Sequence, residues 1–119
     1  MKKVLIVDDC PDSRFTLKTI LESYHVEIYE APDGLDGWKN IINKKPDLVL
    51  LDLEMPHKDG FEVLDDIKEE WIDVPVVVIS GVDADKAAEL CQLNGALAFI
   101  QKPVNLSVFN ETVNPILSD

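Results

Sequence analysis

Residues 4–9 read VLIVDD, four apolar residues that run directly into two aspartates. An apolar run this short, rich in β-branched residues and closed by polar ones, predicts a strand buried on both faces. Comparable short apolar runs occur further along the chain, at residues 26–29, 48–51, 74–79 and 97–100. The sequence therefore predicts five strands of this kind.

The stretches between these runs carry apolar residues at helical spacing, three and four positions apart. The predicted stripes are Leu17, Ile20, Leu21 and Tyr24; Leu35, Trp38, Ile41 and Ile42; Leu64, Ile67 and Trp71; Ala84, Ala87, Ala88 and Cys91; and Leu106, Phe109, Val113 and Ile116. We therefore predict five helices, one after each strand.

Residues with particular backbone preferences mark the ends of these predicted helices. Pro11 suits a first helical position, and Pro115 would weaken the last turn of the fifth helix. Candidate N-caps are Asp33, Asp83 and Asn105, a turn is predicted at Asp59-Gly60, and a helix stop at Asn94-Gly95.

Strict alternation of strand and helix predicts an α/β fold with a doubly wound parallel sheet, right-handed crossovers and helices on both faces. A barrel is excluded because 119 residues cannot supply eight strand–helix units. We expect residues 1–119 to form a single domain, and one fold of this kind uses the whole stretch.

Charge and composition exclude several classes of function. The chain has 23 acidic and 11 basic residues, a formal net charge of −12, which disfavours direct binding of nucleic acid or of an anionic membrane. No apolar run has the length of a signal peptide or a membrane span, so the expected location is cytoplasmic. Cys10 and Cys91 are expected to be free thiols, and neither His25 nor His57 lies in zinc-ligand spacing.

Polar residues with compatible chemistry follow the predicted strands. Asp8 and Asp9 follow the first strand, and Asp52 follows the third. Ser80 follows the fourth strand, and Lys102 follows the fifth. Because ligands of open parallel sheets gather at the carboxyl ends of the strands, we expect these side chains to converge on one edge.

Three clustered carboxylates repel one another unless they take up protons or bind a cation. Oxygen ligands that share a hard cation with a phosphate are typical of Mg²⁺. A metal, an ammonium and a hydroxyl would together offset the charge of a transferring phosphoryl group, so Asp52 is a reasonable nucleophile. Single aspartates in such loops are usually helix caps, but that reading does not account for all of these strand ends together.

The motifs that carry the chemistry are VLIVDD at 4–9, DLEMP at 52–56 followed by Gly60, Ser80-Gly81, and Lys102-Pro103. In this order and spacing the chain resembles the receiver domain of two-component response regulators over nearly its whole length. The resemblance implies a flavodoxin-like receiver fold with strand order 2-1-3-4-5.

The resemblance also implies residue roles. Asp52 would be the phosphoacceptor, and Asp9 would bind Mg²⁺ directly. Asp8 would bind it mostly through water, and the backbone carbonyl of Glu54 would complete the protein's share of the ligands. Whether Glu54 and Val82 lengthen or shorten the life of the phosphorylated state is left open.

Three further roles follow from the resemblance. Ser80 and Lys102 would contact phosphoryl oxygens, and a cis Lys102-Pro103 bond would aim the lysine inward. Phe99 would rotate together with a shift of Ser80 as the phosphorylation switch, although a plain core role for Phe99 stays open. Gly81 would leave room beside the phosphoryl group or simply serve the turn.

The implied partners are a sensor histidine kinase or phosphotransfer protein as donor, and a downstream protein target or output domain. Output would pass through the face formed by the fourth helix, the fifth strand and the fifth helix, and a phosphorylation-dependent homodimer is possible. The protein would be a stoichiometric phosphoacceptor and not an enzyme.

Three other functions fit less well. A Mg²⁺-dependent phosphohydrolase of the haloacid dehalogenase type places its nucleophile after the first strand with a second Asp two positions on, whereas Glu54 occupies that offset here. A flavodoxin would need a phosphate cradle where residues 8–12, DDCPD, repel anions. A degenerate receiver that acts only as an interaction module would not need all of these site residues.

Overall fold

The computed structural model describes residues 1–118, and their side chains apart from Ala84, Lys86, Ala88, Leu90 and Cys91. The strands are β1 (Lys2–Val7), β2 (Val26–Ala31), β3 (Leu48–Leu51), β4 (Val76–Ser80) and β5 (Ala98–Gln101). The helices are α1 (Pro11–Leu21), α2 (Gly34–Lys44), α3 (Gly60–Glu69), α4 (Ala84–Leu93) and α5 (Leu106–Leu117). Of these helices, as far as the chain is described, none is both long and apolar enough to cross a bilayer.

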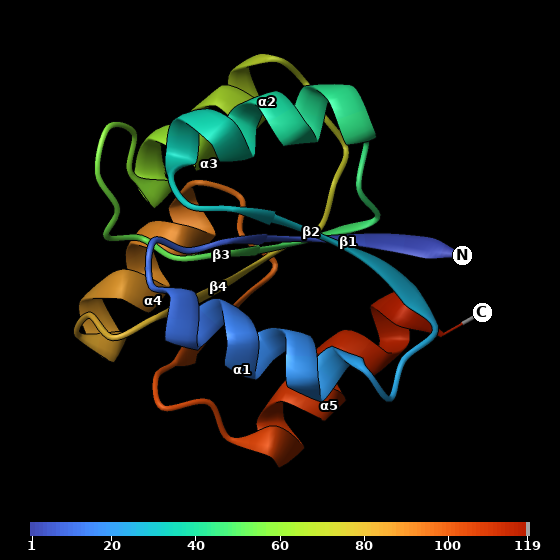
Figure 1. Cartoon of the computed structure of the whole chain (residues 1–119). Coiled ribbons are helices and arrows are strands. Elements are labelled where there is room, and N and C mark those ends of the chain that lie inside the picture. Colours follow the sequence, from blue (N-terminus) through green and yellow to red (C-terminus); the bar gives the residue numbers. More distant parts are fainter. Residues whose placement is uncertain (119) are drawn as a thin grey trace.

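The strands form one parallel sheet in the order β2-β1-β3-β4-β5, which confirms the predicted order. Figure 1 shows the sheet nearly edge-on, with α2 and α3 above it and α1 and α5 below. The fold is therefore α/β, with a helix layer on each face of the sheet.

Alternate residues of each central strand feed two separate cores. Leu5 and Val7 point into the core between the sheet and α2, α3 and α4. Val4 and Ile6 point into the core between the sheet and α1 and α5. β1, β3 and β4 are buried almost throughout, as their apolar runs predict. β2 and β5 are only partly buried because they lie at the two edges of the sheet, as the implied strand order places them. The prediction that these two strands are buried on both faces is therefore wrong.

Several helix ends confirm the sequence predictions. Pro11 opens α1, and the side chains of Asp33 and Asn105 accept hydrogen bonds from the first turns of α2 and α5. Asp59, expected only as a turn residue, forms a full capping box with Glu62 at the start of α3. Gly95, with φ of 88°, follows the end of α4 as predicted, whereas a cap at Asp83 stays a prediction.

The last helix continues past Pro115 to Leu117. The ammonium of Lys2 donates hydrogen bonds to the carbonyl oxygens of Ile116 at 2.6 Å and of Ser118 at 3.3 Å. A positive charge at a helix C-terminus satisfies carbonyls that lack partners within the helix. The start of β1 thereby supports the final turn of α5.

Three of the predicted helix stripes contain residues that are exposed; in the fifth, Leu106 is 55% exposed at the start of α5. In the second stripe Ile41 is buried and Trp38 packs against the core, as predicted. Leu35 and Ile42 are about half exposed, and α2 also buries Gly34 and Gly37 against its neighbours. A Cβ on Gly37 would lie 2.7 Å from a methyl carbon of Val7, so the helix packs too closely for a larger residue there. The buried side of α2 thus includes two glycines that the spacing of apolar residues does not mark.

The third stripe ends earlier than predicted. α3 stops at Glu69, and Trp71 lies beyond the helix with 91% of its surface exposed. Trp71 is therefore not a core residue. In the fourth stripe Ala87 is buried as predicted, whereas the predictions for Ala84, Ala88 and Cys91 lie outside the described side chains.

Candidate functional site

The carboxyl ends of β1 and β3 bring three aspartates together. One carboxylate oxygen each of Asp8, Asp9 and Asp52 lies within 4.8 Å of the others. Asp8 and Asp52 are only 2% and 7% exposed, while Asp9 faces solvent. The predicted convergence is present, and the cluster combines two buried charges with one that is open to water.

Lys102 reaches this cluster from the end of β5. Its Nζ lies 2.9 Å from Oδ2 of Asp8 and 3.4 Å from Oδ2 of Asp52. The Lys102-Pro103 peptide bond is cis, as the resemblance implied, and the backbone N–H of Lys102 donates to the Ser80 carbonyl at 2.9 Å. The ammonium therefore bridges two of the three carboxylates.

The electrostatics of the cluster are set by burial and by this bridge. Burial raises the pKa of Asp52 above its ordinary value of 3.8, although the nearby Lys102 charge opposes the shift. Burial disfavours the charged form of Lys102, but the hydrogen bond to Asp8 and the charge of Asp52 outweigh it and raise the pKa of the lysine. The lysine is thus charged, and a cation or phosphoryl ligand would meet it as an ammonium.

Ser80 stands at the end of β4 with 1% of its surface exposed. Its Oγ is a buried side-chain polar atom, among those described, that has no hydrogen-bond partner. Buried hydroxyls normally have a hydrogen-bond partner, so this one calls for an explanation, and a group bound beside the neighbouring Asp52 would supply it. The Ser80 hydroxyl is therefore available to a group bound at the cluster.

Asp8 is held by contacts that the sequence did not reveal. Arg14 donates from Nη1 to the Asp8 carbonyl at 2.6 Å and from Nε to Glu30 at 3.2 Å. Lys18 also pairs with Glu30, at 3.1 Å, and the Cys10 N–H donates to Oδ1 of Asp8 at 2.9 Å. Glu30, near the end of β2, thus anchors the arginine that fixes the Asp8 backbone.

The loop between β3 and α3 is packed tightly against both of its neighbours. A Cβ on Gly60 would lie 2.3 Å from the Asp52 carbonyl oxygen, and one on Gly34 would lie 1.9 Å from the Lys58 carbonyl oxygen. Lys58 pairs with Asp66 and lies over the Trp38 ring, 6.0 Å from its centroid. Glu54 lies in this loop with its side chain exposed, so a ligand role would fall to its backbone.

The remaining predicted residues lie on β5 and in the segment that follows β4. Phe99 on β5 is partly buried and packs against the core on the α2–α4 side. The side-chain amide of Gln101 donates to the carbonyl of Val82 at 3.3 Å, which ties the end of β5 to the loop after β4. Gly81 is exposed, and a Cβ there would meet nothing within 4 Å.

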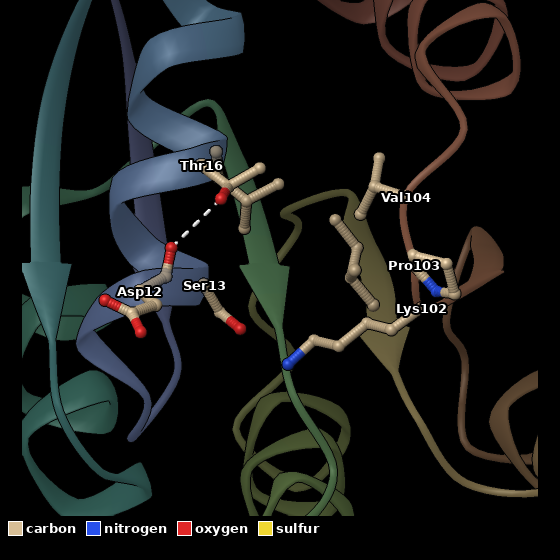
Figure 2. Close-up of a pocket in the computed structure, with 8 residues that line it drawn as sticks. Asp12, Ser13, Thr16, Lys102, Pro103 and Val104 are labelled. Atoms are coloured by element: carbon tan, nitrogen blue, oxygen red, sulfur yellow. Dashed lines mark hydrogen bonds between the residues drawn. The ribbon is translucent and has the colours of Figure 1, made fainter.

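A cavity of about 450 Å³ adjoins Lys102, between α1 and the segment after β5. In Figure 2 the side chain of Lys102 extends across this cavity, with Pro103 and Val104 on one side and Ser13 and Thr16 on the other. The aliphatic part of Lys102 lines the cavity while its Nζ contacts the acidic cluster, so this one side chain separates the cavity from the cluster.

Comparison with known proteins agrees with this geometry. The family model described as the response regulator receiver domain matches residues 4–114. Protein PilH of Pseudomonas aeruginosa is 30% identical over 120 residues, covering 99% of both chains. The transcription regulator BvgA of Bordetella pertussis, described as putative, is 35% identical over 113 residues, covering 94% of this chain but 53% of BvgA.

Solved structures show the same likeness. The N-terminal domain of an uncharacterised protein from Wolinella succinogenes superposes with a TM-score of 0.89 and 32% identity, covering 98% of this chain and 94% of that one. The signal receiver domain of a putative Luxo repressor from Vibrio parahaemolyticus has a TM-score of 0.92 and 28% identity, and the match covers 98% of this chain and 89% of that one. The chain thus spans nearly all of PilH, but only about half of BvgA.

Proposed function

Since the chain belongs to the response regulator receiver domain family, we propose that it accepts a phosphoryl group on Asp52 with the help of Mg²⁺. The observation that carries the proposal is the convergence on Asp52: two further carboxylates lie within 4.8 Å, and an ammonium lies 3.4 Å away. The family implies a phosphoacceptor role in two-component signalling, and this cluster is where the chain has the chemistry for it.

The donor set fits Mg²⁺. Carboxylate oxygens are the ligands that this hard cation prefers, and the exposed Asp9 offers a route for a hydrated ion. Asp8, Asp9 and Asp52 would hold the ion together with the Glu54 carbonyl. When bound, the ion would neutralise charge on the transferring phosphoryl oxygens.

The protein's own residues would then perform the transfer. One carboxylate oxygen of Asp52 attacks phosphorus, the new O–P bond forms, and the P–N bond of a donor phosphohistidine breaks. The electron pair of that bond stays on the imidazole nitrogen, which takes up a proton. Lys102 pairs with one phosphoryl oxygen, and Ser80 donates its unpartnered hydroxyl to another.

The donor would be a sensor histidine kinase or a phosphotransfer protein, and the transfer would be stoichiometric, so the protein would be a switch and not an enzyme. A shift of Ser80 toward the phosphoryl group would vacate space into which Phe99 turns. This change would alter the surface of α4, β5 and α5, which would contact a downstream target, an output domain or a second copy of the chain.

Incubation with a small acyl phosphate and Mg²⁺ tests the phosphoacceptor role. We expect a mass increase of one phosphoryl group, lost in Asp52→Asn and retained in the matched control Asp12→Asn, whose carboxylate lies outside the cluster. An increase that survives Asp52→Asn would overturn the assignment.

Two other outcomes would point to other functions. A wild-type chain that gains no mass but still binds partners would be a degenerate receiver that acts only as an interaction module. Turnover of a small phosphate ester far above one equivalent would indicate a phosphohydrolase.

A further inference from the structure

The end of α3 has the hydrogen bonds of a Schellman motif. The N–H of Ile72 donates to the Ile67 carbonyl at 3.0 Å, and the N–H of Trp71 donates to the Lys68 carbonyl at 3.2 Å. Trp71 has φ of 55°, the left-handed conformation that this motif requires. Glycine is the usual residue at this position because it has no Cβ to strain.

Tryptophan is a poor choice for this position by itself. Its bulky side chain is strained at positive φ, and at 91% exposure it gains almost no packing energy in return. Lys45 at the end of α2 and Gly95 after α4 also have positive φ. Glycine carries no strain there, and the exposed lysine keeps a charged end in water, whereas Trp71 exposes a large apolar ring. The position of the indole is therefore not explained by the stability of the chain.

Hollowed surface surrounds this indole. A groove of about 780 Å³ lies beside Trp71, and a second of about 310 Å³ runs from Ile72 to Leu93, which is 67% exposed. Both grooves are bordered by Ile72 and Asp73. We call this region the Trp71 surface. It consists of Trp71, Ile72 and Leu93 and the acidic residues Asp65, Glu69, Glu70 and Asp73.

The Trp71 surface is remote from the phosphorylation site. Residues 71–73 precede β4, at the amino edge of the sheet, whereas Asp52 and Ser80 lie at its carboxyl edge. An occupant of this surface would therefore bind without contacting the acidic cluster.

Charge indicates what binds here. Asp65, Glu69, Glu70 and Asp73 are all exposed around the indole, with Lys68 as the basic residue among them. A second copy of a chain with net charge −12, or an anionic membrane, would be repelled. An arginine-bearing segment would instead gain both charge pairing and stacking of its guanidinium on the indole.

We propose that the Trp71 surface docks a basic, arginine-bearing segment of a partner protein, which would give this chain a second recognition surface apart from its phosphorylation switch. The exposed indole is the anchor, and the surrounding carboxylates select for positive charge. Tryptophan and arginine are both enriched among the few residues that carry most of the binding energy of an interface.

A peptide titration tests the proposal. The probe is a capped synthetic peptide of alternating arginine and leucine, with the glutamate–leucine peptide as its charge-reversed control. Binding is followed by NMR at the indole N–H signals of Trp71 and Trp38, the latter a control within the same chain. We expect the arginine peptide to shift the Trp71 signal, and the glutamate peptide to leave it in place.

Matched variants separate specific docking from general attraction to an acidic protein. Trp71→Gly keeps the net charge and should weaken binding by roughly tenfold or more. Phe15→Ala, which removes another exposed aromatic ring on α1, should leave binding unchanged. Equal affinity of wild type and Trp71→Gly, or no binding of the arginine peptide at all, would overturn the proposal.

Two further measurements guard against a merely structural role. Because glycine suits the left-handed position, Trp71→Gly should raise Tm by about 3–6 °C. A fall in Tm would show that Trp71 packs in the fold and would remove the argument. A Trp71-dependent dimer in sedimentation velocity would likewise overturn it, in favour of a second copy as occupant.

Discussion

At the scale of single residues, Lys102 carries the balance of charge in the site. Its ammonium contacts both buried aspartates and offsets their repulsion before any ligand binds. The same ammonium also repels an incoming metal ion. The lysine therefore stabilises the protein without metal, at the expense of metal affinity.

Replacing Lys102 with methionine should tighten Mg²⁺ binding and slow phosphorylation. Removing one positive charge beside the carboxylates should favour the ion by about 1 kcal/mol, roughly fivefold in Kd, after solvent screening. Isothermal titration with MgCl₂ measures the affinity, and phosphorylation by a small acyl phosphate measures the rate. Weaker Mg²⁺ binding in Lys102→Met would contradict this account of the charge balance.

Asp52 gives the site a pH dependence. Because its pKa is raised in the folded protein, the native state holds the proton more tightly than the unfolded chain does. Its contribution to stability is then present below its ordinary value of 3.8 and is lost as pH rises through the raised folded value.

The expected consequence is that Asp52→Asn is more stable than wild type at neutral pH in EDTA, and that this advantage shrinks as the pH falls toward 3.8. Urea unfolding of both proteins across this range measures the difference. Asp12→Asn, an exposed control, should show no such trend. An advantage that grows on acidification would mean that the fold favours the ionised form of Asp52, opposite to the raised pKa.

At the scale of whole elements, the loop between β3 and α3 depends on two helix N-termini that carry glycine. Gly34 and Gly60 leave space that the carbonyls of Lys58 and Asp52 occupy. The loop is thereby held against α2 on one side and against the phosphoacceptor strand on the other. These contacts determine the position of the loop and of Glu54 within it.

Gly34→Ala should destabilise the protein by about 1–3 kcal/mol, because the new methyl group would overlap the Lys58 carbonyl and force the loop away from α2. Gly81→Ala is the matched control, since its Cβ would meet nothing within 4 Å. Denaturant unfolding compares the two variants. If Gly34→Ala and Gly81→Ala are equally stable, the loop can move away from α2 at little cost in free energy, which would contradict the prediction.

The sequence predicted those elements whose cause is local. Short apolar runs predicted the central strands, and Asp33 and Asn105 predicted helix starts, because each depends on neighbouring residues in the chain. It predicted Ile41 and Trp38 on the buried side of α2 but missed the buried glycines beside them, and it placed Trp71 in the helix stripe of α3. Neither close packing of glycine nor a helix end in the left-handed conformation produces an apolar spacing in the sequence.

The same distinction holds for the site. Convergence of the aspartates, Ser80 and Lys102 was predictable because parallel strands bring their carboxyl ends to one edge. The role of Arg14 could not be predicted, because it donates to the backbone carbonyl of Asp8, and every residue has such a carbonyl. The pairing of Glu30 with Arg14 depends on the end of β2 lying beside α1, which the sequence does not specify.

At the scale of the whole molecule, the net charge of −12 produces self-repulsion that screening by salt relieves. NaCl should therefore raise Tm, and MgCl₂ at equal ionic strength should raise it further, because an ion that binds only the folded state adds its own stabilisation. In Asp9→Asn, which weakens the cluster, we expect the extra effect of MgCl₂ to shrink toward that of NaCl. Thermal melts in the two salts provide the measurement.

The hydrogen bonds from Lys2 to Ile116 and Ser118 hold residues from opposite ends of the described chain in contact. Figure 1 shows both ends leaving on the same side of the molecule. A short peptide bridge would therefore suffice to join them, and the backbone could then be reopened in an exposed loop elsewhere. The order in which the ten elements are synthesised is thus separable from the architecture that they build.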